Sequence, residues 1–297
     1  MTLKSLRAVA AFAVAAALAP QAMADIDLST PEGVLKANRK INCSTIDEKP
    51  ITYSWHGKGW SRRRGEADQN IFDVVGMNVR MCVADEHPER GKGYRLISRE
   101  ILLYTDPKTG QALDIWENPW TGKAVKVIHV ENDPVNSANY LIGRDGKPLK
   151  WTASEHSGSW WRTATVPLFY HNVLAGDYQR YVGNAYHATE MFNYFGEIAD
   201  LVDDSKDTAA IKVGWVRQSE WLPWMQMQGR EGIIYMHTAG KKVAGYDDLP
   251  EVMRTYIETR APKYAGPPPS DDKRPNETSW TYFKKMVKSE TLPRGGH

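Results

Sequence analysis

The sequence predicts a mainly β protein: a single antiparallel β-barrel of the lipocalin or calycin type, with helices packed at the barrel ends. Three observations lead to this fold class. Apolar and polar residues alternate along several long runs, short turns rich in Pro and Gly separate the runs, and the chain holds eleven Trp and fourteen Tyr. Alternation indicates a sheet with two different faces, and short turns make neighbouring strands antiparallel. Aromatic residues with a polar handle suit a half-polar cavity, or simply strands.

The first 24 residues have the pattern of a cleaved secretory signal peptide. A basic start and an apolar run lead to a small-residue cleavage site that ends at Ala24. The run is about half of the ~20 residues that a membrane-spanning helix needs, and no other stretch is long enough. We therefore expect a periplasmic or secreted protein without a membrane span. Its residues 25–297 should form one β-barrel domain with a C-terminal helical extension at about 247–288.

Charge argues against a nucleic-acid partner. The signal holds two of the 38 basic residues and none of the 36 acidic ones, so the mature chain is close to neutral. A protein that grips phosphates should show a basic excess or stripe. The one basic run, Arg62–Arg64, is followed closely by Glu66 and Asp68 and is interpreted as a solvated turn.

The sequence holds two cysteines, Cys43 and Cys82. Two thiols within reach of each other tend to pair in an oxidising compartment, but sequence does not say whether their Cα atoms are close enough. A bridge would close a loop of about 40 residues and stabilise the fold by ~3–4 kcal/mol in the chain-entropy model. Whether these cysteines pair, and what the oligomeric state is, therefore stay open.

The stretch 99–136 predicts one wall of the barrel as a three-stranded meander with turns at 106–110 and 118–122, where Pro and Gly suit tight turns. Its first strand places Arg99 on one face and Glu100 on the other. Its end carries a polar cluster that we expect to face the cavity: His129, Glu131, Asn132 and Asn136.

Other elements follow from the same patterns. Gly57, Gly59 and Gly76 interrupt the first two strands, which indicates bulges or bends where the sheet curls. The predicted strands are 51–61, 71–84, 160–171, 211–217, 224–228 and 233–243, and the predicted helices are 27–42, 186–201, 249–260 and 276–288.

The predicted helix at 186–201 supplies the candidate base. His187, Glu190 and Tyr194 lie three and four residues apart, so a helix would place them on one face. Apolar and aromatic residues bracket Glu190, and desolvation of such a carboxylate raises its pKa toward the value that a general base needs. A surface helix with a solvated Glu190 is the alternative.

Several motifs resemble the bacterial domain-of-unknown-function family numbered 1838. The likeness covers roughly residues 30–288 and implies membership without implying any particular reaction. It carries over Glu190 and Tyr194, whereas the position of His187 varies. The matching motifs are the stretches 53–57, 104–122, 133–136, 190–195, 221–225 and 276–280, together with His129.

The first functional hypothesis is a cofactor-free lyase, isomerase or dehydratase that acts on an apolar small molecule of aromatic, steroid or terpenoid type. Glu190 would be the base, His129 its acid partner, and Tyr194 or Tyr235 the hydrogen-bond donor to developing charge. Signatures of phosphate loops, dinucleotide folds and haem attachment are missing, so no cofactor is expected. The remaining substrate-binding candidates are Arg99, Trp116, Asn132, Asn136, His171, Trp215, Trp224, Tyr235 and His237.

Two alternatives stay open. A lipocalin-like carrier would use the same cavity to hold an apolar ligand without reacting with it. A metalloenzyme would need His129, His171 and His237 to converge with Glu190. Because no closely spaced ligand pair supports a metal site, we expect none.

Overall fold

The computed structural model describes residues 25–171, 185–227 and 229–289. The predicted signal peptide lies outside these ranges. Within them, no helix is long and apolar enough to cross a bilayer.

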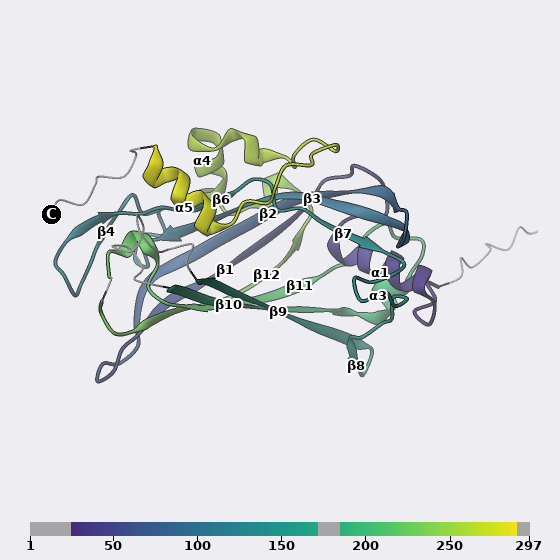
Figure 1. Ribbon diagram of the computed structural model, residues 1–297, viewed down its shortest axis with the longest axis horizontal. Coiled ribbons are helices and arrows are strands. Elements are labelled where there is room, and N and C mark those ends of the chain that lie inside the picture. The colour runs from purple at the N-terminus through teal and green to yellow at the C-terminus, as the bar shows by residue number, and fades with distance from the viewer. Residues whose placement is uncertain (1–24, 172–184, 228, 290–297) are drawn as a thin grey trace, which may run out of the picture.

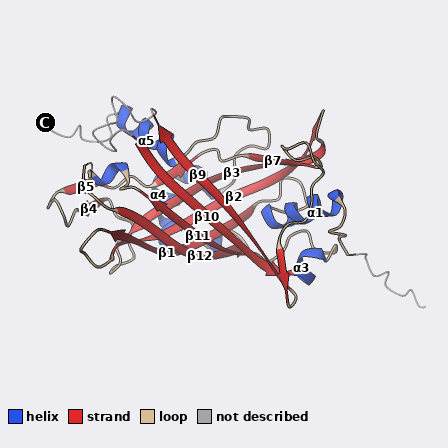
Figure 2. Cartoon of the chain, turned by 60° about the horizontal axis from the view of Figure 1, so that its bottom comes forward, coloured by secondary structure: helices blue, strands red, loops and turns tan. Residues whose placement is uncertain are grey.

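Ten strands of the described residues form one strongly curled antiparallel sheet (Figures 1 and 2). The strands are β1 (Ile51–Arg62), β2 (Gln69–His87), β3 (Gly91–Thr105), β6 (Val130–Asn132), β7 (Ser137–Tyr140), β8 (Ser154–His156), β9 (Ser159–His171), β10 (Ala185–Glu197), β11 (Lys212–Ser219) and β12 (Ile233–Val243). Their order is β6-β3-β2-β1-β12-β11-β10-β9-β8, with β7 also paired to β3. The mainly β, antiparallel prediction is confirmed. In the described part of the chain β6 and β8 end the strand order and do not pair with each other, so a closed barrel is not found.

Helices lie at both ends of the sheet. At one end lie α1 (Pro31–Asn42) and α3 (Ile198–Val202). Toward the other lie α5 (Ser279–Lys288) and the small hairpin of β4 (Ile115–Glu117) and β5 (Ala124–Lys126) (Figure 1). The described residues also form α4 (Glu251–Arg260) and 3₁₀ turns at Pro223–Met225, Tyr246–Asp248 and Pro262–Ala265.

The two faces of β2 and β3 meet different neighbours. Odd-numbered residues such as Met77 and Ile101 pack under α4, against Met253 and Ile257. Even-numbered residues of the same strands point to the concave face, which lines a cavity. Successive side chains of a strand point to opposite sides, so this choice decides which polar residues can meet a ligand.

Glycines give the concave face its room. A Cβ atom on Gly76 would lie 2.2 Å from the Trp55 ring, and one on Gly240 would lie 2.5 Å from the Trp55 Cβ atom. Gly76 on β2 therefore leaves room for the Trp55 ring, and Gly240 on β12 allows close approach of the Trp55 backbone. The register of β1 with β2 shifts between Gly59 and Trp60, which confirms a predicted irregularity there. Gly76 lies within a regular register, where it makes space for a ring and no bulge.

The helix predicted at 186–201 is wrong. Residues 185–197 form β10, which pairs with both β9 and β11, and only the short α3 follows. Glu190 and Tyr194 lie four residues apart, and both a helix and a strand put such a pair on one face. His187, an odd number of residues from Glu190, points to the other face and pairs with Glu220 on the surface.

Two further predictions need correction. The predicted meander continues as a separate two-stranded sheet, β4 (Ile115–Glu117) with β5 (Ala124–Lys126), and not as part of the main sheet. Both turns are where the sequence placed them, with Gly110 and Gly122 at positive φ. The strand predicted at 224–228 begins instead as a 3₁₀ turn, because Pro223 lacks the N–H that a sheet ladder needs.

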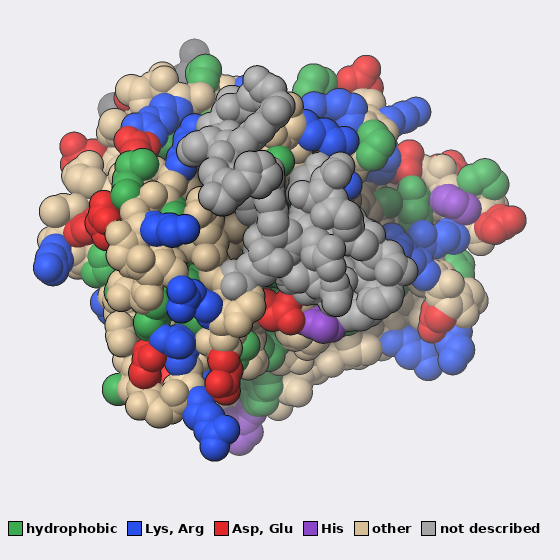
Figure 3. All heavy atoms as spheres, turned by 60° about the vertical axis from the view of Figure 1, so that its left-hand side comes forward, with side chains coloured by type: hydrophobic (Ala, Val, Ile, Leu, Met, Phe, Trp, Pro, Cys, Tyr) green, Lys and Arg blue, Asp and Glu red, His purple; other side chains and the backbone are tan. Residues whose placement is uncertain are grey.

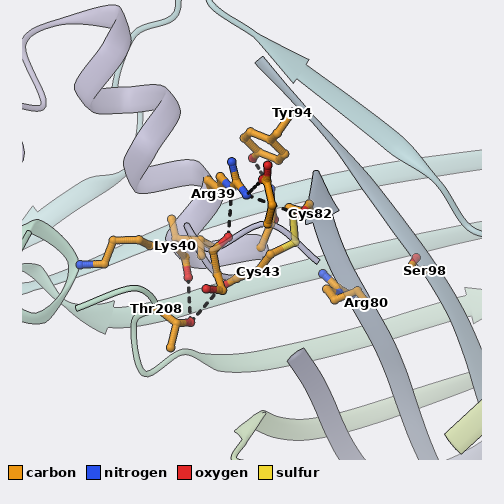
Figure 4. The surroundings of a disulfide bond; sticks show 12 residues. Arg39, Lys40, Cys43, Arg80, Cys82, Tyr94, Ser98 and Thr208 are labelled. Atoms are coloured by element: carbon orange, nitrogen blue, oxygen red, sulfur yellow. Dashed lines mark hydrogen bonds and ion pairs between the residues drawn. A yellow bond between two sulfur atoms is a disulfide. The ribbon is translucent and has the colours of Figure 1, made fainter. Parts of the chain in front are cut away.

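Cys43 and Cys82 form a disulfide with their Cα atoms 5.9 Å apart (Figure 4). Cys43 ends α1 and Cys82 lies on β2, so the bridge ties the N-terminal helix to the sheet. The sequence did not decide whether the two cysteines pair, and the structure shows that they do.

The basic run 62–64 behaves as the solvated turn that charge patterning predicts. Arg62 pairs with Asp68 and Arg63 with Glu66, each at 2.6 Å. On the face drawn in Figure 3, basic and acidic side chains are interspersed.

Candidate functional site

A cavity of about 340 Å³ lies inside the curl of the sheet. The concave face of the sheet forms most of its wall, and residues 128–137, 222–224 and α5 complete it. Its apolar surface is largely aromatic, with Trp55, Phe192, Trp215, Trp224 and Trp280 among the lining residues. Ligand sites of proteins typically combine such an apolar wall with a few convergent polar groups.

Glu190 and Arg217 form an ion pair at the cavity wall. They are register neighbours on β10 and β11, and Arg217 Nη1 lies 2.5 Å from Glu190 Oε1. The exposed fraction of the side chain is 8% for Arg217 and 19% for Glu190. Arg217 Nη2 also donates to the Tyr186 hydroxyl at 3.4 Å. The guanidinium gives Glu190 a positively charged partner, whereas the sequence predicted a carboxylate bracketed by apolar and aromatic residues.

Glu100 is a second carboxyl group in the same cavity. Asn132 Nδ2 donates to its Oε1 at 2.7 Å, and Asn78 Nδ2 lies at the limit of hydrogen bonding, 3.5 Å from its Oε2. Burial raises the pKa of Glu100; the charge of Glu190 acts in the same direction, and the Asn132 bond opposes both. Glu100 is therefore the cavity acid that holds its proton more strongly than an ordinary glutamate.

His129 is buried where the polar cluster meets β3. Its Nδ1 accepts a hydrogen bond from the Tyr104 backbone N–H at 3.2 Å, which leaves the proton of a neutral ring on Nε2. Among the described residues Nε2 has no partner. Burial lowers the pKa of His129 to about 4. The ring is therefore neutral near pH 7 and can donate a hydrogen bond, but it is not the imidazolium that the predicted role of acid partner would use.

The structure brings together most of the predicted site residues and separates the rest. His171 is the last residue of β9, and its side chain lies outside the described residues. Lining the cavity are His129, Asn132, Asn136, Glu190, Tyr194, Trp215 and Trp224. Lying elsewhere are Arg99, Trp116, Tyr235 and His237.

Arg99 and Trp116 are structural. Arg99 points away from the cavity, where its Nε lies 3.3 Å from a carboxylate oxygen of Asp133 and its guanidinium faces the Tyr264 ring. Trp116 is buried in the core, and its Nε1 donates to the Ile71 carbonyl at 3.2 Å. Both were expected to bind substrate, and neither lines the cavity; Trp116 packs behind the cavity residue Trp224, with ring centroids 5.9 Å apart.

Tyr235 and His237 lie on the outer face of β12. Tyr235 donates to Asp68 at 3.0 Å and stacks on Trp60. His237 is exposed. Because Glu190 faces inward, His237 does not converge with it as the alternative of a metalloenzyme would need. No group of three His, Cys, Asp or Glu side chains within the described ranges could hold a metal ion.

Sequence reasoning missed three charged residues that line the cavity: Glu100, Arg217 and Arg80. Alternation along β3 places Glu100 and Arg99 on opposite faces of the strand. What the sequence did not show is which of the two faces lines the cavity. Arg217 lies on the inward face of β11 with Trp215, and this period-2 relation was the available signal for it.

Comparison with known proteins gives a family but no characterised relative. No curated protein matches the chain. The family described as "Protein of unknown function (DUF1838)" matches residues 48–287, which include every strand of the curled sheet and the cavity wall up to α5. The chain therefore belongs to the DUF1838 family.

Proposed function

We propose that the cavity binds a mostly apolar small molecule and that the protein moves a proton on it, as a lyase, isomerase or dehydratase that needs no cofactor. One observation carries the proposal. Two carboxyl groups with contrasting surroundings, Glu100 and Glu190, face the same aromatic-walled cavity. Where the surroundings of two acids differ in this way, one can give a proton and the other can take one.

Glu190 has the surroundings of a base, because it lines the cavity beside the Arg217 guanidinium, which forms an ion pair with it. Glu100 has those of an acid, because burial raises its pKa. In a dehydration, Glu190 takes a proton from a C–H bond and Glu100 gives its proton to the leaving hydroxyl. A C=C bond forms as the C–O bond breaks, and water leaves. In an isomerisation Glu190 removes a proton at one carbon while Glu100 protonates a conjugated oxygen. Glu190 then returns the proton to a second carbon as Glu100 takes its own proton back from the oxygen.

We further propose that the protein works outside the cytoplasm. The signal-peptide pattern that ends at Ala24 supports export. The disulfide of Cys43 and Cys82 supports it independently, because disulfides persist in oxidising compartments and are rare in the cytosol.

The test begins with the ligand. Solvent extraction and mass spectrometry of protein purified from its own cells identify what the cavity holds, and that molecule then serves as substrate. We expect Glu190→Gln and Glu100→Gln each to lower turnover by about 10²–10⁴-fold. The exposed Glu117→Gln is the matched control and should leave turnover unchanged. Unchanged turnover in both folded cavity variants would remove the proposed chemistry.

A carrier is the second candidate, and the ion pair of Glu190 favours it. A carboxylate held by Arg217 and a neutral His129 bonded to the backbone can orient a ligand without exchanging protons with it. A carrier should release the extracted molecule chemically unchanged after long incubation. Accumulation of a product in wild type but not in Glu190→Gln would decide for the enzyme.

A further inference from the structure

Arg80 is a cavity cation that the proposed proton transfer does not use. It lies on the concave face of β2, two residues before Cys82 and in register with Ser98 of β3 (Figure 4). Its Nε donates to Asn78 Oδ1 at 2.8 Å, and its guanidinium carbon lies 4.7 Å from the centre of the Tyr53 ring. These contacts hold one edge and one face of the group, and its terminal nitrogens make no hydrogen bond within the described ranges although the residue lines the cavity.

No carboxylate neutralises Arg80 within the described ranges, whereas the cavity's other arginine, Arg217, has Glu190. Asn78 links Arg80 to Glu100. Burial raises the pKa of Glu100, whereas the charge of Arg80 acts in the opposite direction. A second cation lies close by, because Lys242 Nζ is 5.6 Å from the centre of the same Tyr53 ring. This end of the cavity therefore brings two basic side chains to one aromatic ring.

Lys242 satisfies its own donors, which separates it from Arg80. Its Nζ donates to the Lys40 carbonyl and to Thr208 Oγ1, each at 2.7 Å. Burial lowers the pKa of Lys242 to about 7, and the charge of Arg80 acts in the same direction. Arg80 is thus the cation of this pair with donors left for a ligand.

The surroundings also hold the Arg80 group in place. Tyr53, on which it stacks, donates its hydroxyl to the Ile41 carbonyl of α1 at 2.5 Å. The Cys43–Cys82 bridge ties the same stretch of β2 to the end of α1. A guanidinium that is already oriented loses little freedom when it binds a planar anion through two parallel hydrogen bonds.

We propose that Arg80, with Asn78 and Tyr53, forms an anion subsite, and that the ligand is an amphipathic carboxylate. Its carboxylate would bind the terminal nitrogens of Arg80, and its apolar body would lie along Trp55 and the other cavity aromatics. This inference rests on the proposed function insofar as both need the cavity to bind a ligand. It adds the acidic head group, which the proton transfer by itself does not require.

Two probes of matched shape test the subsite: 2-naphthaleneacetate and the neutral 2-(2-naphthyl)ethanol. Binding to the full mature protein is measured by calorimetry or by quenching of Trp fluorescence. We expect wild type to prefer the carboxylate by about 10- to 100-fold, the range for hydrogen bonds to a charged group. Arg80→Gln should abolish the preference by weakening the acetate alone, and Arg80→Lys should keep part of it.

Arg90→Gln is the matched control, because Arg90 also stacks on a tyrosine at 4.7 Å but does not line the cavity. It should keep the wild-type preference. Equal binding of both probes by wild type would overturn the subsite while leaving an apolar cavity in place. A wild-type preference that persists in folded Arg80→Gln would assign the anion to another cation and overturn the subsite too. Binding of neither probe by wild type would overturn both this inference and the proposed function.

Discussion

Replacing Arg217 by Met should lower the free energy of unfolding by about 3–5 kcal/mol, because it leaves the Glu190 carboxylate at the cavity wall without its cation. Met keeps much of the length and apolar contact of the arginine stem, so the lost charge dominates the effect. Both side chains are largely shielded from water, with exposed fractions of 8% for Arg217 and 19% for Glu190.

The magnitude follows from the geometry of the pair. With one N···O distance of 2.5 Å, the two charge centres lie roughly 4 Å apart, and at an effective dielectric constant of about 20 their attraction is about 4 kcal/mol. The unpaired carboxylate also loses its best hydrogen-bond donor. A pair on the open surface is worth far less, about 0–1 kcal/mol.

Urea unfolding followed by Trp fluorescence measures the effect, and a double-mutant cycle isolates the pair. Glu190→Met added to Arg217→Met should recover part of the lost stability, because no buried charge then remains. Arg62→Met breaks an exposed pair with Asp68 and is the control, with an expected cost below about 1 kcal/mol. Strictly additive effects of the two cavity substitutions would mean that Arg217 and Glu190 do not stabilise each other, contrary to this prediction.

Three further predictions concern stability. Burial holds the pKa of His129 at about 4, below the ~6.5 of an unfolded chain, so only the unfolded state takes up this proton between those values. The free energy of unfolding should therefore fall by up to about 3 kcal/mol as pH drops from about 6.5 to about 4. The His129→Asn variant should lack this pH dependence. Equal pH dependence in wild type and variant would contradict the prediction. Reduction of Cys43–Cys82, 39 residues apart, should cost ~3–4 kcal/mol in urea titrations, and an unmoved midpoint would count against the bridge. Gly76→Ala should lower thermal stability by about 1–3 kcal/mol through overpacking, whereas Gly245→Ala meets open space and should change little; similar melting of the two would contradict the packing account.

Local patterns in the sequence predict the strands well where the chain pairs with its neighbour. β1, β2 and β12 lie close to the predicted ranges because their alternation is long and their turns are short. The predicted helix at 186–201 fails because a four-residue spacing fits both a helix and a strand. Pairing with β9 and β11 decides between them, and that information lies in residues on either side of β10.

The candidate site depends on facts that sequence leaves undetermined. Alternation places Arg99 and Glu100 on opposite faces of β3 but does not say which of them faces the cavity. The packing of α4 on the odd-numbered side determines this. A shift of one residue in the strand register would exchange the two faces. The partners of Glu190 and His129 are likewise set by tertiary structure. Arg217 reaches Glu190 from the next strand, and the Tyr104 backbone fixes the imidazole.

The protonation of Glu100 decides whether the cavity combines an acid, Glu100, with a base, Glu190. NMR titration of the glutamate side-chain carboxyl carbons in ¹³C-labelled protein, assigned with Glu100→Gln, reads it without any ligand. We expect Glu100 to titrate at a higher pH than an ordinary glutamate, and Glu190→Gln to lower the pKa of Glu100 because one negative charge is removed. A Glu100 that titrates at or below the ordinary value, unmoved by the Glu190 substitution, would contradict the pairing of an acid with a base in this cavity.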